Sequence, residues 1–268
     1  MAQEKWLVEG EKVIDIEMIR NLKVSLIGGQ VDIVGHDEPG ARVEVHSVHG
    51  KPLKVSIDGD TLEVDHPQLN WDNFLEVFTS FHGTAKADVS IMVPRDVALK
   101  FGAISAKGLI SGLTEDAKIS TVSGDIVVDN VYGDLELNAV SGEIAVRNHY
   151  GSIVSRTVSG DVTANGEIMN FRSDGVSGNV FLDLVGIPQE ARIKTVSGNV
   201  TTRLAAGVAA RYRINTVSGK LQLDDSEITG IRGTYTGKYG ELDGQWLDFS
   251  ASTVSGDVAV LHGAEVPR

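Results

Sequence analysis

A three-residue phrase, Val-Ser-Gly, recurs between residues 121 and 257 and constrains the fold more than any other feature of the sequence. The first four copies are 18 residues apart, and the later intervals are 20, 21 and 37 residues. A fixed period of this size predicts repeated units that stack on one another. The copies are Val122-Ser123-Gly124, Val140-Ser141-Gly142, Val158-Ser159-Gly160, Val176-Ser177-Gly178, Val196-Ser197-Gly198, Val217-Ser218-Gly219 and Val254-Ser255-Gly256.

Apolar and polar residues alternate on both sides of each copy, as in Leu135, Leu137 and Ala139 before the second and Ile144 and Val146 after it. Period-two alternation predicts strands with one buried face, joined by a corner at the glycine. A second corner is expected halfway, at Tyr132-Gly133 and Tyr150-Gly151. The predicted fold is therefore all-β: a parallel β-solenoid (β-helix) of about 8–9 coils with a ~18-residue period, roughly 40 Å long.

Stacking gives each residue of the phrase an expected structural role. The serines form a ladder that satisfies corner backbone groups, and the valines pack as a second ladder of β-branched side chains. The glycine suits a corner that requires a positive φ or leaves no room for a side chain.

Residues 1–94 lack the repeat and read as a mainly antiparallel β segment that caps the solenoid of residues 95–262, with a tail at 263–268. Within the cap, residues 70–82 are expected to form a short helix. Trp71, Phe74, Phe78 and Phe81 fall on one face of that helix. This face either covers an end of the β core or forms an aromatic docking surface.

The interval between Gly219 and Gly256 allows two interpretations. Gly237 lies 18 residues after Gly219, which favours two coils, the second without the full phrase. A glycine-rich run with Tyr235, Tyr239 and Trp246 favours one coil with a projecting hairpin. These three aromatic residues are further candidates for an interaction surface.

Composition excludes several classes of function. A net charge of -13 argues against binding to nucleic acid or an anionic membrane, because both need clustered Lys and Arg. The absence of cysteine excludes disulfides and thiolate sites. No apolar run of signal-peptide or membrane-spanning length is present, so we expect a cytoplasmic protein without direct membrane insertion, which a partner could recruit to the membrane.

The position after each repeat glycine is mostly polar, which raises the question of a metal site. Stacked carboxylates could bind calcium, but the G-G-x-G-x-D pattern is absent and a lysine interrupts the row, so solvated turns are the favoured interpretation. The seven histidines are scattered, and only His46 and His49 are close in sequence. No catalytic, metal or cofactor residues are predicted. The polar row is Asp125, Glu143, Asp161, Asn179, Asn199, Lys220 and Asp257.

The iterated T-V-S-G-D/N blocks at 121–125, 157–161, 195–199 and 253–257 resemble a bacterial β-strand-repeat domain family of unknown function often labelled "putative adhesin". The resemblance covers nearly the whole chain. It implies a β-solenoid fold and a bacterial origin, and it brings no catalytic residues.

These observations predict a non-catalytic scaffold or protein-interaction module whose partner is another protein or a second copy. One alternative is a filament assembled end to end in the manner of bactofilins, because each end of a solenoid presents unpaired strand edges. Another is a carbohydrate-binding or carbohydrate-active β-helix. Its candidate aromatic residues are Tyr132, Tyr150, Tyr235, Tyr239 and Trp246.

Overall fold

The computed structural model describes residues 4–66, 85–228 and 233–263, and every regular element among them is a β-strand. The chain divides into two compact units, residues 1–133 and 134–268. In each unit the strands form two hydrogen-bonded ladders, and apolar side chains that alternate along the strands are buried.

The described residues of the first unit form twelve strands in two ladders. One ladder has the order β1–β6–β7–β3–β9–β11, and the other has the order β2–β5–β8–β4–β10–β12. The strands are β1 (Glu4–Val8), β2 (Lys12–Ile16), β3 (Asn21–Leu26), β4 (Gly29–His36), β5 (Ala41–His49), β6 (Leu53–Asp58), β7 (Thr61–Asp65), β8 (Lys86–Pro94), β9 (Ala98–Ala103), β10 (Lys107–Ser111), β11 (Ala117–Thr121) and β12 (Ile126–Asp129).

Pairing in the first unit changes direction along each ladder. The outer pairs β1–β6, β6–β7, β2–β5 and β5–β8 are antiparallel. From β7 and β8 onward the pairs are parallel, so β3 pairs with β9 and β4 with β10. These last two pairs cross the predicted boundary after residue 94.

The second unit also has two ladders, which we call ladder A and ladder B. Ladder A is β14–β15–β17–β23–β19–β22, and ladder B is β14–β15–β16–β18–β24–β20–β21; the long strands β14 and β15 begin both. The strands are β13 (Tyr132–Ala139), β14 (Ile144–Thr157), β15 (Val162–Gly175), β16 (Val180–Leu184), β17 (Glu190–Lys194), β18 (Val200–Leu204), β19 (Ala210–Thr216), β20 (Leu221–Leu223), β21 (Ser226–Ile228), β22 (Gly233–Tyr239), β23 (Leu247–Thr253) and β24 (Val258–His262).

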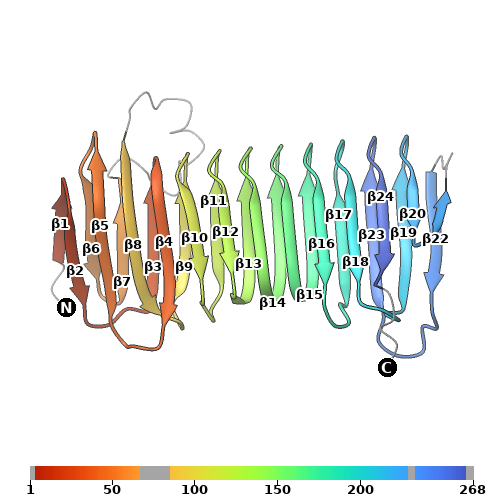
Figure 1. Cartoon of the computed structure of the whole chain (residues 1–268), viewed down its shortest axis with the longest axis horizontal. Coiled ribbons are helices and arrows are strands. Elements are labelled where there is room, and N and C mark those ends of the chain that lie inside the picture. The colour runs from red at the N-terminus through yellow and green to blue at the C-terminus, as the bar shows by residue number, and fades with distance from the viewer. Residues whose placement is uncertain (1–3, 67–84, 229–232, 264–268) are drawn as a thin grey trace. The chain divides into compact units, whose positions relative to one another are not determined.

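The carboxyl-terminal strands are inserted between earlier ones. β23 pairs in parallel with both β17 and β19, and β24 pairs in parallel with both β18 and β20 (Figure 1). The 37-residue interval is therefore an excursion: β21 and β22 pair antiparallel with β20 and β19 before the chain returns. Gly237 belongs to antiparallel β22, so it does not mark a second parallel repeat.

The predicted fold class, a parallel β-solenoid of about 8–9 coils preceded by a segment with one short helix, is wrong. The sheets are mixed, because antiparallel pairs occur in both units, and no described residue is helical. The prediction failed because the repeat spacing indicates parallel pairing only in the part of the chain where Val-Ser-Gly recurs. The predicted helix at 70–82, with Trp71, Phe74, Phe78 and Phe81, lies outside the described residues.

Parallel pairs in the second unit follow the repeat spacing. Ile144 lies opposite Val162, and Val162 lies opposite Val180, each 18 residues further along the chain. The corner glycines lie against one another in the same order. A Cβ atom at Gly160 would overlap the carbonyl oxygen of Gly142, and one at Gly198 would overlap that of Gly178. Close approach, and not a positive φ, therefore requires glycine at these corners.

Positive φ angles occur instead at the halfway corners. Gly133 has a φ of 94°, Gly151 of 145° and Gly166 of 137°. These backbone conformations are unfavourable for residues with a Cβ atom. Glycine is therefore required for close approach at the Val-Ser-Gly corners and for a positive φ at the halfway corners. Both reasons were among those expected from the sequence.

Polar residues of the repeat satisfy corner backbone groups. The hydroxyl groups of Ser123 and Ser159 donate to the carbonyls of Ile104 and Val140, each at 3.1 Å. In the polar row, Asp161 Oδ1 accepts the backbone N–H of Asn179 at 2.7 Å. The same bond links Asn179 to Asn199, Asn199 to Asp257 and Asp257 to Lys220.

The valines do not behave as predicted. Val122 is buried, but Val158, Val176, Val196, Val254 and Val217 are 48–63% exposed. The expected packing ladder is therefore wrong for these five residues, because each valine follows the end of a ladder A strand and its side chain faces outward. A buried threonine precedes four of them, and Gly175 precedes Val176. The core is instead made by the strand residues on either side, including the fully buried Phe171 and Phe249.

His66 is an unusual buried group in the first unit. Its Nδ1 accepts the N–H of Ile27 at 3.2 Å, whereas its Nε2 has no hydrogen-bond partner among the described residues. Burial, with a smaller contribution from Lys51, lowers the pKa of His66 from 6.5 to about 4. The folded chain therefore holds this imidazole neutral.

Replacing a corner glycine should destabilise the second unit. We expect Gly198→Ala to lower the free energy of unfolding by about 1–3 kcal/mol, because the added methyl group overlaps a backbone oxygen. Gly244→Ala is the control, since no atom lies within 4 Å of a Cβ at that position. Urea unfolding measures both, and equal stability of the two variants would contradict the close-approach explanation.

Acidification should lower the stability of the protein through the buried His66. Because the folded pKa of His66 lies below its unfolded value, its contribution to stability is complete above about pH 6.5 and is lost as the pH falls toward about 4. Between pH 7 and pH 5 we expect this residue to remove about 2 kcal/mol of unfolding free energy. His66→Gln keeps an acceptor but does not titrate, so its loss over the same interval should be smaller. Identical pH dependence of the two proteins would contradict this assignment.

Candidate functional site

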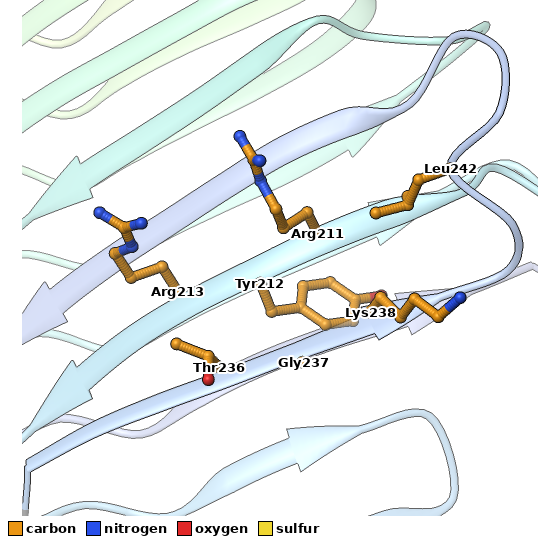
Figure 2. A pocket seen from close by; sticks show the side chains of 7 residues that line it. All are labelled: Arg211, Tyr212, Arg213, Thr236, Gly237, Lys238 and Leu242. Atoms are coloured by element: carbon orange, nitrogen blue, oxygen red, sulfur yellow. The ribbon is translucent and has the colours of Figure 1, made fainter.

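A hollow of about 380 Å³ lies over the antiparallel pair formed by β19 and β22. Figure 2 shows the side chains around it. Strand β22 belongs to the excursion in which the repeat is interrupted, so this surface is absent from the regular repeats. The lining residues are Arg211, Tyr212, Arg213, Thr236, Gly237, Lys238 and Leu242.

Strand alternation positions these residues. In β19, Arg211 and Arg213 are exposed, whereas Tyr212 between them points inward and is 3% exposed. The register places Arg211 opposite Lys238 and Arg213 opposite Thr236. Residues opposite one another in a ladder share a face, so Arg211, Arg213 and Lys238 all lie on the outer face of this strand pair.

Tyr212 forms the buried base of this strand pair. Its ring meets the ring of Phe249 edge to face, with centroids 6.3 Å apart. Burial, together with the charge of Asp224, raises the pKa of Tyr212 well above its usual value. The phenol therefore stays neutral and is a structural group.

The three cations differ in their ion pairs. Arg211 pairs with Asp248, which raises the pKa of the guanidinium, and Lys238 pairs with Glu241 at 3.3 Å. Arg213 forms no ion pair with any residue that the structure describes. Its guanidinium is consequently available to an external anion.

More cations lie along the same ladder. Arg172 on β15 pairs with Asp174, and Arg192 on β17 pairs with Glu190. Lys194 on β17, like Arg213, has no ion pair within the described ranges. Ladder A from β15 to β22 thus exposes six cations. We call these the basic face: Arg172, Arg192, Lys194, Arg211, Arg213 and Lys238.

Strand β22 is anchored at its carboxyl end. The Tyr239 ring stacks on His262 with centroids 3.7 Å apart and planes inclined by 17°. His262 is itself held by Asp224, whose oxygens lie 3.0 Å from Nδ1, and by the carbonyl of Val208, 3.1 Å from Nε2. These contacts connect β22 to β24 and to the turn after β20.

The aromatic residues predicted as an interaction surface have varied environments. Tyr239 is 37% exposed and contributes one ring face to the stack on His262, Tyr235 is half-buried beside Gly237, and Trp246 is half-buried before β23. Tyr132 and Tyr150, proposed for carbohydrate binding, are exposed. Trp71, Phe74, Phe78 and Phe81 lie outside the described residues.

Sequence reasoning missed the basic residues of the site. A signal was present: Tyr212, Ile214 and Thr216 alternate before Val217 as inward-facing strand positions, so Arg211 and Arg213, which flank Tyr212, had to face outward. The contribution of Lys238 could not be found in this way, because its position depends on β22 folding back against β19.

The described residues contain no group of three or more His, Cys, Asp or Glu side chains arranged to hold a metal ion. They also contain no helix long and apolar enough to cross a membrane. In the polar row considered for calcium, the side-chain oxygens of Asp161, Asn179 and Asn199 instead accept hydrogen bonds from backbone N–H groups of the next repeat.

The chain belongs to the Toastrack DUF4097 family, whose sequence profile matches residues 19–261. No curated protein matches the sequence.

Several solved structures are similar over nearly their whole length. A "putative lipid binding protein" from Parabacteroides distasonis is 12% identical, with 94% of this chain and 97% of that chain covered and a TM-score of 0.47. A "putative adhesin" from the same organism is 12% identical, with 97% of each chain covered and a TM-score of 0.44. A "putative cell adhesion protein" from Clostridium sporogenes is 12% identical, with 98% and 99% covered and a TM-score of 0.31.

Removing the aromatic anchor should loosen β22 selectively. In Tyr239→Ala we expect backbone amides of β22 to exchange with solvent about tenfold faster, since an aromatic pair is worth about 0.5–1.5 kcal/mol. Amides of β17 should be unchanged. Tyr150→Ala, which removes an exposed tyrosine from β14, is the control. Unchanged exchange of β22 in Tyr239→Ala would show that the stack does not hold the strand.

Proposed function

We propose that this chain is a non-catalytic protein-interaction module that binds an acidic segment of a partner protein at the hollow between β19 and β22. The observation that carries the proposal is the gathering of Arg211, Arg213 and Lys238 around one hollow in a chain with a net charge of -13. Two of these cations are paired with Asp248 and Glu241, which leaves Arg213 as the guanidinium that no described carboxylate neutralises, and such a charge can bind an external anion.

Chemistry at the hollow suits carboxylates. Arginine presents planar pairs of N–H donors that match a carboxylate, and Arg213 has no competing ion pair within the described part of the chain. Thr236 adds a hydroxyl group, and Leu242 adds an apolar wall. The combination suits an acidic side chain flanked by an apolar one.

The remaining charge of the chain supports a short acidic segment over a long polyanion. Nucleic acids extend their charge over many phosphates and would meet the negative surfaces of the rest of the chain. A short peptide can meet the basic face alone. Repulsion elsewhere then contributes to specificity.

Strand β22 offers a second element of recognition. Among the described strands it pairs only with β19, so its other edge is the edge of ladder A within the described residues. An extended peptide can add to such an edge, with side chains alternating toward the basic face. The glycines and the lysine in β22 are features that natural edge strands use against indiscriminate pairing.

A non-catalytic role fits the composition of the hollow. Its seven lining residues include no carboxylate, histidine or cysteine, and its tyrosine has a raised pKa. General acid–base catalysis needs a group that titrates near the working pH. A cytoplasmic location, with recruitment to a membrane through the partner, remains part of the proposal and is consistent with the absence of cysteine.

An acidic peptide tests the proposal directly. We expect a fluorescent 20-residue glutamate-rich peptide, followed by anisotropy, to bind the wild-type chain and to bind Arg213→Glu/Lys238→Glu about tenfold or more weakly, because two contacts reverse sign. The matched control is Arg147→Glu/Arg203→Glu, which makes the same change in net charge at exposed arginines of ladder B. Equal loss in both variants would mean that only net charge matters, and would contradict a site at the hollow.

A further inference from the structure

Five valines of the second unit form a continuous apolar row, which we call the valine ridge. Backbone hydrogen bonds establish the order of its inner members: Val196 N–H donates to Val176 at 3.1 Å, and Val254 N–H donates to Val196 at 3.1 Å. Ser177 and Ser218 make the equivalent bonds to the carbonyls of the neighbouring valines. From one end to the other the ridge is Val158, Val176, Val196, Val254 and Val217, each 48–63% exposed.

The valine position is constant among the five repeats, whereas a nearby position on the same strand is not. Two positions earlier the side chain varies freely, with Arg156, Asp174, Lys194, Ser252 and Asn215 in the same order. The valine does not vary, although it contributes little to the core. Single exposed apolar residues are ordinary, whereas a contiguous row marks an interaction surface.

The polar groups beside the ridge already have partners inside the chain. Ser159 and Ser177 donate their hydroxyls to the carbonyls of Val140 and Val158, at 3.1 and 3.4 Å. Asn199 Oδ1 accepts the backbone N–H of Asp257 at 3.0 Å. Covering the ridge therefore breaks few hydrogen bonds to water, which keeps the cost of desolvation small.

We propose that the valine ridge binds the valine ridge of a second copy of this chain. Its valines repeat at the separation of neighbouring strands, roughly 4.8 Å. Two rows of β-branched side chains with equal spacing can pack valine against valine, in a dry contact like that of a steric zipper. The ridge of a second copy has the same spacing, so it can match the first ridge at all five valines.

Charges beside the ridge select the direction in which the two copies run. With parallel ridges related by a two-fold axis, the ladder A flank of one copy faces the ladder B flank of the other. Arg156, which also pairs with Glu136 at 2.9 Å, then meets Asp161, and Lys194 meets Asn199. Antiparallel ridges would place Lys194 against Lys194, which is repulsive. The parallel arrangement brings no like charges together.

The interface is small. Stable complexes bury about 800 Å² per partner, and five half-exposed valines cover less than that. The dimer should therefore dissociate on dilution. This inference is independent of the acidic-peptide site, since the ridge and the hollow share no residue.

The absence of cysteine from the chain makes cross-linking a clean test. Val196 is the central residue of the ridge, so Val196→Cys should face its own copy and form a disulfide-linked dimer under mild oxidation. Val158→Cys should cross-link to itself in the parallel arrangement. The control is Val185→Cys, an exposed valine off the ridge, which should stay monomeric.

Sedimentation of the chain without cysteine provides an independent measurement. The wild-type mass should rise from one copy toward two with concentration, and Val176→Thr/Val196→Thr/Val254→Thr should shift this transition at least tenfold upward. Threonine keeps the β-branched shape, and Val13→Thr/Val34→Thr/Val185→Thr is the matched control at exposed valines elsewhere.

Three results would overturn the proposal. These are a wild-type chain that stays monomeric at every concentration, equal cross-linking of Val196→Cys and Val185→Cys, and equal dimerisation of the two threonine variants. Cross-linking of Val158→Cys to Val217→Cys in a mixture, in place of self-cross-linking, would overturn the parallel arrangement.

Discussion

Contact between backbones at the corners is the constraint on which the second unit depends. Gly160, Gly178 and Gly198 each lie against the carbonyl oxygen of the preceding corner glycine, and no Cβ atom fits between them. This contact lets β14, β15 and their successors pair in parallel along both ladders at once. Serine hydroxyls and Asp or Asn side chains then form hydrogen bonds with backbone groups at these tight corners.

Repetition produces the scaffold, and its interruption produces the candidate site. In the regular repeats, alternation buries one face of each strand and leaves the other face toward solvent. Where the phrase is delayed by 37 residues, β22 folds back on β19 and brings Lys238 beside Arg211 and Arg213. The stack of Tyr239 on His262 then holds this added strand against the returning chain.

Local features were predictable from sequence, whereas the connection of the strands was not. Alternation identified most strands of the repeats, and the 18-residue spacing matched the register of β14, β15 and β16. Antiparallel pairing was expected for residues 1–94, whereas the parallel pairs of β3 with β9 and β4 with β10 and the insertion of β23 depend on contacts between distant residues that leave no periodic signal. The exposure of Val196 was not predicted, because β-branched side chains occur at buried and at exposed strand positions alike. The family match extends over residues 19–261 and gives no residue roles.

Insertion of β23 and β24 has a consequence for the order in which the protein can be made. When residues 190–223 leave the ribosome, β17 and β19 have no shared neighbour, because β23 is still unsynthesised. Their facing edges stay open until residues 247–262 arrive and close both ladders together. Strand pairing across such sequence distances is slow, and open edges are prone to wrong partners. Closure of the edges of β17, β18, β19 and β20 therefore waits for β23 and β24, whereas β14, β15 and β16 can pair as they emerge.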